Sequence, residues 1–268
     1  MVDILEWAAL GLIPAFLLLD FCVAARAYAK PRFWRLRGLA VTVAIVLFAG
    51  EVSAFWGNVL DGRSLFDLGG IGMLAGAAIG VLVYQLAHYW YHRFAHEWDW
   101  LWRAGHQMHH SAESLDAFGA FYQHPLDAAF FTTWMSLVFF PLLGLSVEAG
   151  VLAAVFLTFN AMFQHANIAT PYWLGFLIQR PESHNIHHGR GIHRYNYADL
   201  PVIDMLFGTF RNPRSIEDSA CGFYDGASRR IPEMLVGIDV SKPRDAAHET
   251  RGGSASATVD DGTKLSIG

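Results

Sequence analysis

Long apolar segments alternate with short polar ones over the first two thirds of the chain. Three of them have close to the roughly 20 residues that an α-helix needs to cross a bilayer, namely residues 4–25, 38–60 and 68–87. A fourth, residues 128–163, would be about 54 Å long as a straight helix, too long for one ~30 Å crossing. Pro141 and Gly144 interrupt it, so we predict two helices that form a hairpin.

The composition supports a membrane protein. Hydrophobic residues make up 53% of the chain and charged residues only 16%, whereas soluble domains carry roughly 25% charged residues. We therefore predict an all-α, integral-membrane bundle of about four to five membrane helices with a histidine-rich helical cap. The net charge of −5 argues against a nucleic-acid partner.

Changes in polarity along the chain suggest three parts. Residues 1–64 hold the N-terminal membrane helices, residues 65–240 form a domain that carries the histidines, and residues 241–268 are rich in Gly, Ser, Ala and Asp. The last part is predicted to be disordered.

The charge of the first loop predicts the topology. Residues 26–37 contain five Arg or Lys residues between the first two apolar segments, and basic loops of this kind remain in the cytoplasm. This places the N-terminus outside, in an inner or plasma membrane. Strict alternation then brings every histidine cluster to the cytoplasmic side.

Glycines recur at every fourth position of the third apolar segment, at Gly72, Gly76 and Gly80. This spacing puts them on one face of a helix, where a neighbouring helix can approach closely. Glycine is also common in membrane helices for other reasons, so a general preference remains an alternative explanation.

Histidines follow the third apolar segment at spacings that match helix geometry. His92 and His96 are four residues apart, and His88 extends the same face by one turn. Residues three or four apart lie side by side on a helix. Two H-x-x-H-H strings, at residues 106–110 and 184–188, present imidazoles in the same way, either to one metal ion or to two.

Imidazole suits iron, zinc, copper or nickel. Eight or more imidazoles exceed what one ion accepts, so we predict two ions. His165 ends an apolar helix, where an ionisable side chain is a functional candidate. The predicted metal ligands are His92, His96, His106, His109, His110, His165, His184, His187 and His188. His88 and His124 are held as reserve ligands or as residues that contact ligands or substrate.

These motifs, in this order, resemble the fatty acid hydroxylase superfamily of integral-membrane oxygenases, which includes sterol desaturases, sterol C4-methyl oxidases and alkylglycerol monooxygenase. The resemblance covers about residues 84–212 and rests on six stretches: HYWYHRFAHEWDWLWRAGHQMHHSAE, YQHPLD, FQHAN, TPYWLG, ESHNIHHGR and NYADLPVIDMLFGTF. By this resemblance His165 matches the histidine that the hairpin contributes. Two positions depart from the pattern, since Gln85 stands where the family often has Asp and Ala161 where some members have a second His.

The resemblance implies a diiron centre that hydroxylates or desaturates a lipid, sterol-like or fatty acyl, with O₂ and external electrons. Acidic residues can accept the second imidazole N–H and fix the ring, and Asp204, in the closing motif, is the strongest candidate. Asn185 can hydrogen-bond a ligand as well. The chain has no flavin, haem or nucleotide motif, so we expect an electron-donor protein, a ferredoxin or a cytochrome b5-like protein with its reductase. The tryptophans beside the histidines suggest a surface-lying segment, with substrate entering from the bilayer.

Two other functions use the same residues. A metal transporter or storage protein would use histidines as a transit site, but its ligands would be spread through the depth of the membrane. A relative that has lost catalysis is the third possibility, and the intact histidine strings argue against it.

Overall fold

The chain folds into helices in the computed structural model, which describes residues 2–60, 62, 64–215 and 220–244. No β-strand is found within these ranges, and the all-α prediction is confirmed. The predicted disordered tail, 241–268, lies outside the described residues from 245 onward.

Five long helical segments form the bundle. They are α1 (Val2–Cys22), α2 (Trp34–Val59), α3 (Met73–Glu97), α6 (Pro125–Leu137) with its π-helical extension η3 (Val138–Leu142), and α7 (Val147–His165). Four of them, α2, α3, α6 with η3, and α7, are long and apolar enough to cross a membrane. The chain is therefore an integral membrane protein.

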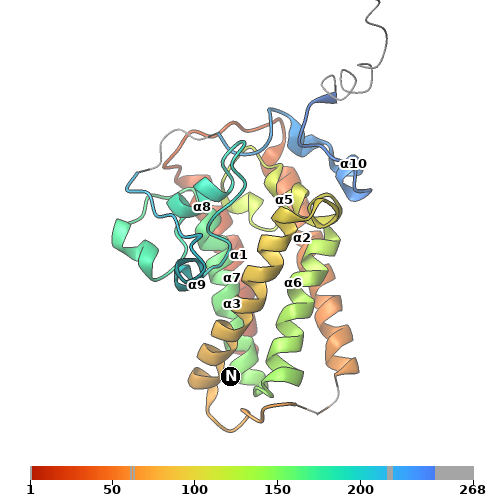
Figure 1. The fold of residues 1–268 in the computed structure, drawn as a ribbon, viewed down its shortest axis with the longest axis vertical. Coiled ribbons are helices and arrows are strands. Elements are labelled where there is room, and N and C mark those ends of the chain that lie inside the picture. Colours follow the sequence, from red (N-terminus) through yellow and green to blue (C-terminus); the bar gives the residue numbers. More distant parts are fainter. Residues whose placement is uncertain (1, 61, 63, 216–219, 245–268) are drawn as a thin grey trace, which may run out of the picture.

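The bundle has two different ends. The N-terminus, the connection between α2 and α3, and the turn between η3 and α7 lie at one end, while the short helices lie at the other (Figure 1). α1 packs on α7, α7 on α3, and α2 on α6. The boundary predicted at residue 64 remains a prediction.

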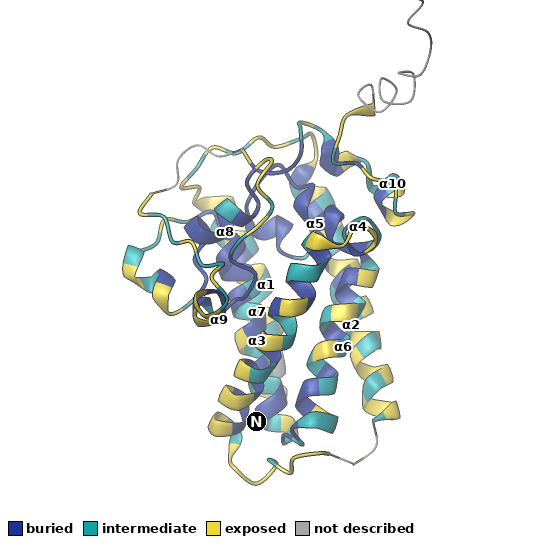
Figure 2. Cartoon of the chain, viewed as in Figure 1, coloured by how far each residue is buried: buried dark blue, intermediate teal, exposed yellow. Residues whose placement is uncertain are grey.

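The cap consists of short helices and loops. Its elements are α4 (Asp99–Leu101), η1 (Trp102–His106), α5 (Gln107–His110), η2 (Ala117–Gly119), η4 (Tyr172–Phe176), α8 (Pro181–His187), α9 (Pro201–Leu206), η5 (Ala227–Arg229) and α10 (Ile231–Leu235). Buried residues are concentrated around α5 and α8, where the cap meets the bundle (Figure 2).

The predicted break in the fourth apolar segment lies at its expected position. η3 contains Pro141, whose ring cannot fit a regular α-helix. The turn that follows includes Gly144 with φ of +62°, a conformation that favours glycine. The amides of Leu65 and Phe66 donate to the carbonyl oxygens of Pro141 and Leu142, which fixes the hairpin against the preceding loop.

Two of the three spaced glycines allow close packing against α3. A Cβ on Gly76 would lie 2.9 Å from the Cβ of Ala149 on α7, and one on Gly80 would lie 2.8 Å from Leu145. Gly72 differs from the prediction, because it precedes α3 at φ +89° and a Cβ added there would have no neighbour within 4 Å.

Replacing Gly76 by leucine should therefore destabilise the bundle. The Cβ of Ala149 is fixed to its backbone, so α3 and α7 must separate, at a cost of about 1–3 kcal/mol of unfolding free energy. The matched control is Gly50→Leu on α2, where nothing lies within 4 Å of the added Cβ. Thermal unfolding in detergent should show a lower midpoint for the first variant only, and equal midpoints would contradict this account.

Candidate metal centre

The structure gathers the nine histidines predicted as ligands into two adjacent groups. Group A contains His92, His96, His106, His110 and His187, and group B contains His109, His165, His184 and His188. One ring nitrogen from each residue in a group lies within 4.8 Å of those of the others. All nine except the half-buried His96 are buried.

Local structure explains how distant parts of the chain meet here. α3 carries His92 and His96 on one face, four residues apart. The π-helix η1 ends at His106 and runs directly into α5; such wide turns are frequent at functional sites. α7 ends at His165, so its last turn delivers this ring to the cap.

Both H-x-x-H-H strings straddle the two groups. His109 belongs to group B and its neighbour His110 to group A, while His187 belongs to group A and His188 to group B. The rings of His110 and His188 stack with centroids 4.2 Å apart. α5 and α8 thus each serve both groups and hold them side by side.

Hydrogen bonds fix the tautomers of four of these rings. The Nδ1 atoms of His92, His187 and His165 lie 2.7, 2.7 and 2.8 Å from the carbonyl oxygens of Tyr197, Tyr195 and Ala161. The Nδ1 of His106 lies 2.8 Å from a carboxylate oxygen of Asp127. These oxygens can only accept a hydrogen bond, so each Nδ1 carries the hydrogen and each Nε2 keeps a bare lone pair.

The Nε2 atoms of the two groups lie close to one another. The Nε2 of His165 lies 3.2 Å from that of His109 and 3.1 Å from that of His184. The Nε2 atoms of His92 and His187 have no hydrogen-bond partner among the described residues. Buried nitrogens of this kind are normally satisfied, and a metal cation held within a group would satisfy several of them at once.

Burial keeps the cap imidazoles neutral. Desolvation lowers the pKa of His109, His110, His184, His187 and His188 well below its usual range, and neighbouring imidazoles lower it further. Neutral imidazole is the form that binds metal ions, so these residues need not lose a proton at physiological pH.

The loop that orients His92 and His187 has an unusual backbone. His193, Tyr195 and Asn196 have φ values of 41°, 71° and 50°, in the left-handed region that non-glycine residues rarely adopt. The Asn196 side chain holds the loop by donating to the carbonyl oxygens of Ser183 and Arg211 and by accepting from the Arg211 amide. Such strain persists where surrounding contacts enforce it.

Asp204 supports the same loop and contacts backbone rather than imidazole. Its carboxylate accepts the amide protons of Tyr197 and Ala198 at 2.8 and 2.9 Å and the hydroxyl proton of Thr209 at 2.7 Å. Asp204 therefore acts on His92 indirectly, through the position of the Tyr197 carbonyl.

The other reserve residues lie outside both groups. His88 stacks on Phe131, with ring centroids 4.9 Å apart. His124 caps α6, since its Nδ1 accepts the Leu126 amide proton at 3.0 Å. Asn185 accepts a hydrogen bond from the Tyr28 hydroxyl at 2.5 Å.

Sequence reasoning missed two residues at the site. Asp127 is fully buried, accepts from His106 and accepts the Tyr91 hydroxyl at 2.6 Å. The sequence could have indicated Asp127, because it is a carboxylate in the first turn of an otherwise apolar helix. His193 is the second such residue: its Nδ1 lies 3.1 Å from that of His110, and burial lowers its pKa to about 4.

Comparison with known proteins identifies a family that shares this part of the chain. Residues 77–209 match the family model described as "Fatty acid hydroxylase". This range contains all nine histidines of groups A and B, as well as Asp127 and Asp204.

Individual proteins match the same part of the chain. Alkylglycerol monooxygenase of Homo sapiens is 38% identical over 135 residues, which cover 47% of this chain and 28% of that protein. The Danio rerio protein of the same name is 36% identical over 133 residues, with the same coverage. Sphinganine C4-monooxygenase 1 of Arabidopsis thaliana is 26% identical over 149 residues, which cover 54% of this chain and 57% of that protein.

The matched part of this chain thus spans less than a third of the length of the alkylglycerol monooxygenases. No solved structure matches the chain.

Proposed function

Since residues 77–209 of this chain belong to the fatty acid hydroxylase family, we propose that the protein is a membrane-bound diiron oxygenase. It hydroxylates or desaturates a lipid with O₂ and electrons from another protein. The observation that carries the proposal is the convergence of buried imidazole lone pairs in two adjacent groups. Two proteins that are similar to this chain are named as monooxygenases of lipids, which supports the same proposal.

In this proposal group A holds one iron ion and group B holds the other. Imidazole nitrogen is a suitable ligand for iron, and the two ions when bound supply the activation of O₂ that C–H cleavage requires. The chain positions the ligands. Asp127 and the carbonyl oxygens of Tyr195 and Tyr197 hold the His106, His187 and His92 rings with their Nε2 atoms turned inward.

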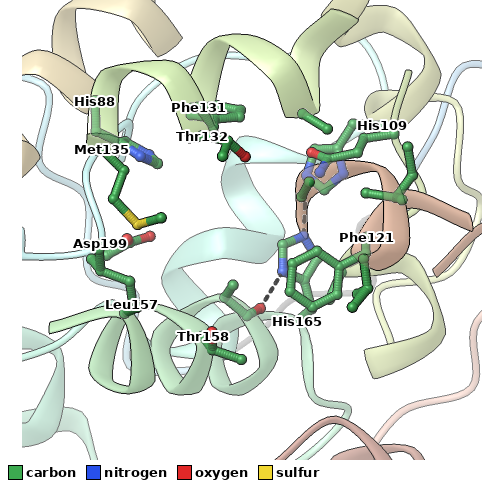
Figure 3. Close-up of a pocket in the computed structure, with 18 of the residues that line it drawn as sticks. His88, His109, Phe121, Phe131, Thr132, Met135, Leu157, Thr158, His165 and Asp199 are labelled. Carbon is green, nitrogen blue, oxygen red and sulfur yellow. Dashed lines mark hydrogen bonds between the residues drawn. The ribbon is translucent and has the colours of Figure 1, made fainter. Parts of the chain in front are cut away.

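A cavity next to both groups accommodates the substrate. It has a volume of about 300 Å³, lies among α1, α2, α3, α6 and α7, and includes His92 and His106 of group A and His109, His165 and His184 of group B in its wall (Figure 3). Most of the remaining wall is apolar, as expected for a site that takes its substrate from the bilayer.

We place the histidine groups on the cytoplasmic side and the N-terminus outside. The basic loop between α1 and α2 lies at the same end of the bundle as the cap, and basic loops remain cytoplasmic. Arg190, Arg194 and Arg211 lie on this side, where an acidic ferredoxin or a cytochrome b5-like protein would dock.

A metal transporter remains less well supported. Transport requires ligands at successive depths, whereas groups A and B lie side by side where the cap meets the bundle. A buried, closely packed pair of sites suits a resident cofactor better than a transit path.

The proposal is tested by incubating the purified protein in lipid nanodiscs with ¹⁸O₂ and a chemical reductant. Hydroxylation consumes O₂, two electrons and two protons, leaves one labelled oxygen in the lipid and releases the other as water. Desaturation uses the same reactants, removes two hydrogens from the lipid and releases both oxygens as water. Mass spectrometry should find one of these products; the absence of both across sterol, fatty acyl and ether lipids would contradict the proposal.

A further inference from the structure

The two ends of the cavity differ in chemistry. One end lies between α1 and α2 and is lined by Leu10, Ile13, Ile45, Val46 and Ala49. α1 packs on α7 and α2 on α6, with no comparable packing of α1 against α2. Leu10 lines the cavity and is also 50% exposed. An alkyl chain can therefore extend from the cavity into the bilayer at this end.

The opposite end carries a buried carboxylate. Asp199 is 5% exposed and lies with His88 and Met135 on one side of the cavity (Figure 3). Its two oxygens accept hydrogen bonds from the side-chain amides of Gln85 and Gln164, at 2.7 and 2.9 Å. The structure thus pairs Asp199 with two glutamine amides and not with an imidazole.

The carboxylate of Asp199 retains capacity for another donor. A carboxylate offers about four lone-pair sites, and each oxygen of Asp199 accepts a hydrogen bond from one neutral side-chain amide. No ion pair to Asp199 occurs among the residues that the structure describes. Burying a carboxylate costs least when its hydrogen bonds are complete, so a ligand that donates an O–H here is favoured and an anionic ligand is repelled.

We infer that Asp199 binds the hydroxyl group of a neutral, alcohol-bearing lipid whose alkyl chain leaves the cavity between α1 and α2. This subsite rests on the proposed function, because it names the class of lipid that the same cavity takes. Free fatty acids are excluded, since their carboxylate would face the carboxylate of Asp199.

The position of the subsite also predicts which carbon is oxidised. The His88 ring, which lies at the same end of the cavity as Asp199, is next to that of His92 in group A, with centroids 5.5 Å apart. A hydroxyl held there places the carbons close to the head group, rather than those far along the chain, beside the histidines.

The test measures binding and does not depend on turnover. Purified protein in detergent is equilibrated with radiolabelled 1-hexadecanol, which is displaced by unlabelled 1-hexadecanol, by hexadecyl methyl ether or, at alkaline pH, by palmitate. Since a hydrogen bond to a charged group is among the stronger ones, the alcohol should bind about 10-fold more tightly than the ether in the native protein. Palmitate should bind more weakly still.

The Asp199→Asn variant should shrink the preference for alcohol over ether to about 3-fold or less. It should also bind palmitate more tightly than the native protein does, because the repelling charge is gone. A variant that had merely lost packing would bind all three probes more weakly. Asp99→Asn, which makes the same change at an exposed carboxylate of the cap outside the cavity wall, is the matched control and should leave the ratios unchanged.

The inference is overturned if the native protein does not prefer the alcohol, or if Asp199→Asn weakens all three probes equally. The binding experiment can fail or succeed independently of the test of the proposed function. A protein that selects the alcohol and oxidises no lipid retains the subsite and loses the proposed activity, while one that oxidises lipids without this selection does the reverse.

Discussion

Replacing His109 by alanine should abolish lipid oxidation, with a fall in turnover of at least about 100-fold. Its Nε2 lies 3.2 Å from that of His165, and its ring lies against that of His188, with centroids 4.7 Å apart. The variant leaves group B with three imidazoles and breaks the link that α5 makes between the two groups. Loss of a ligand costs more than the 10- to 100-fold typical of residues that only orient ligands. Product formation by mass spectrometry, under the ¹⁸O₂ conditions above, measures the effect.

The matched control is His124→Asn. His124 is a buried histidine close to the site, but its Nδ1 caps α6, and asparagine is itself a good cap. Turnover should therefore remain within about 3-fold of the native value. Full turnover in the His109→Ala variant would show that the assignment of group B is wrong, and its loss in His124→Asn would show that this residue belongs to the centre.

Replacing Asp127 by asparagine should lower turnover by about 10- to 100-fold, the range found when a partner of a metal ligand is removed. The asparagine amide can turn its NH₂ group toward His106 and so favour the tautomer that places hydrogen on Nε2. The ring would then present a hydrogen, instead of a lone pair, to group A. Asp127 also accepts the Tyr91 hydroxyl at 2.6 Å, and the neutral amide oxygen of asparagine would accept this hydrogen bond more weakly than the carboxylate does.

A matched change elsewhere should have little effect. Glu97 pairs with Arg93 on the exposed face of α3, one residue after His96, and exposed pairs contribute little. Turnover and iron affinity of Glu97→Gln should therefore equal those of the native protein. If the turnover and iron affinity of Asp127→Asn equalled those of Glu97→Gln, the carboxylate of Asp127 would have no role in orienting His106.

Much of this site could be predicted from the sequence, because the relative positions of residues three or four apart depend only on the helix that carries them. The spacing of His92 and His96, and of His184 and His188, places each pair on one face of a helix wherever that helix lies. The hairpin is equally local, since Pro141 and Gly144 act on their own backbone. The nine histidines could therefore be selected before the structure, and the structure brings all nine together.

The remaining features depend on contacts between distant parts of the chain. The division of His109 and His110 between two groups follows from how η1 and α5 pack against α3 and α8. The backbone carbonyls of Tyr195 and Tyr197 carry no sequence signal, because every residue has one. Asp204 was expected to accept an imidazole N–H, but it accepts the amide protons of Tyr197 and Ala198 instead, and only the folded loop shows this.

Mössbauer spectroscopy of the ⁵⁷Fe-loaded protein tests the central claim most directly. The account predicts two iron ions per chain, both in nitrogen-rich sites and magnetically coupled to each other after oxidation, because groups A and B are adjacent and share α5 and α8. A single uncoupled iron, or iron that binds equally well after His184 and His187 are both replaced by alanine, would contradict it.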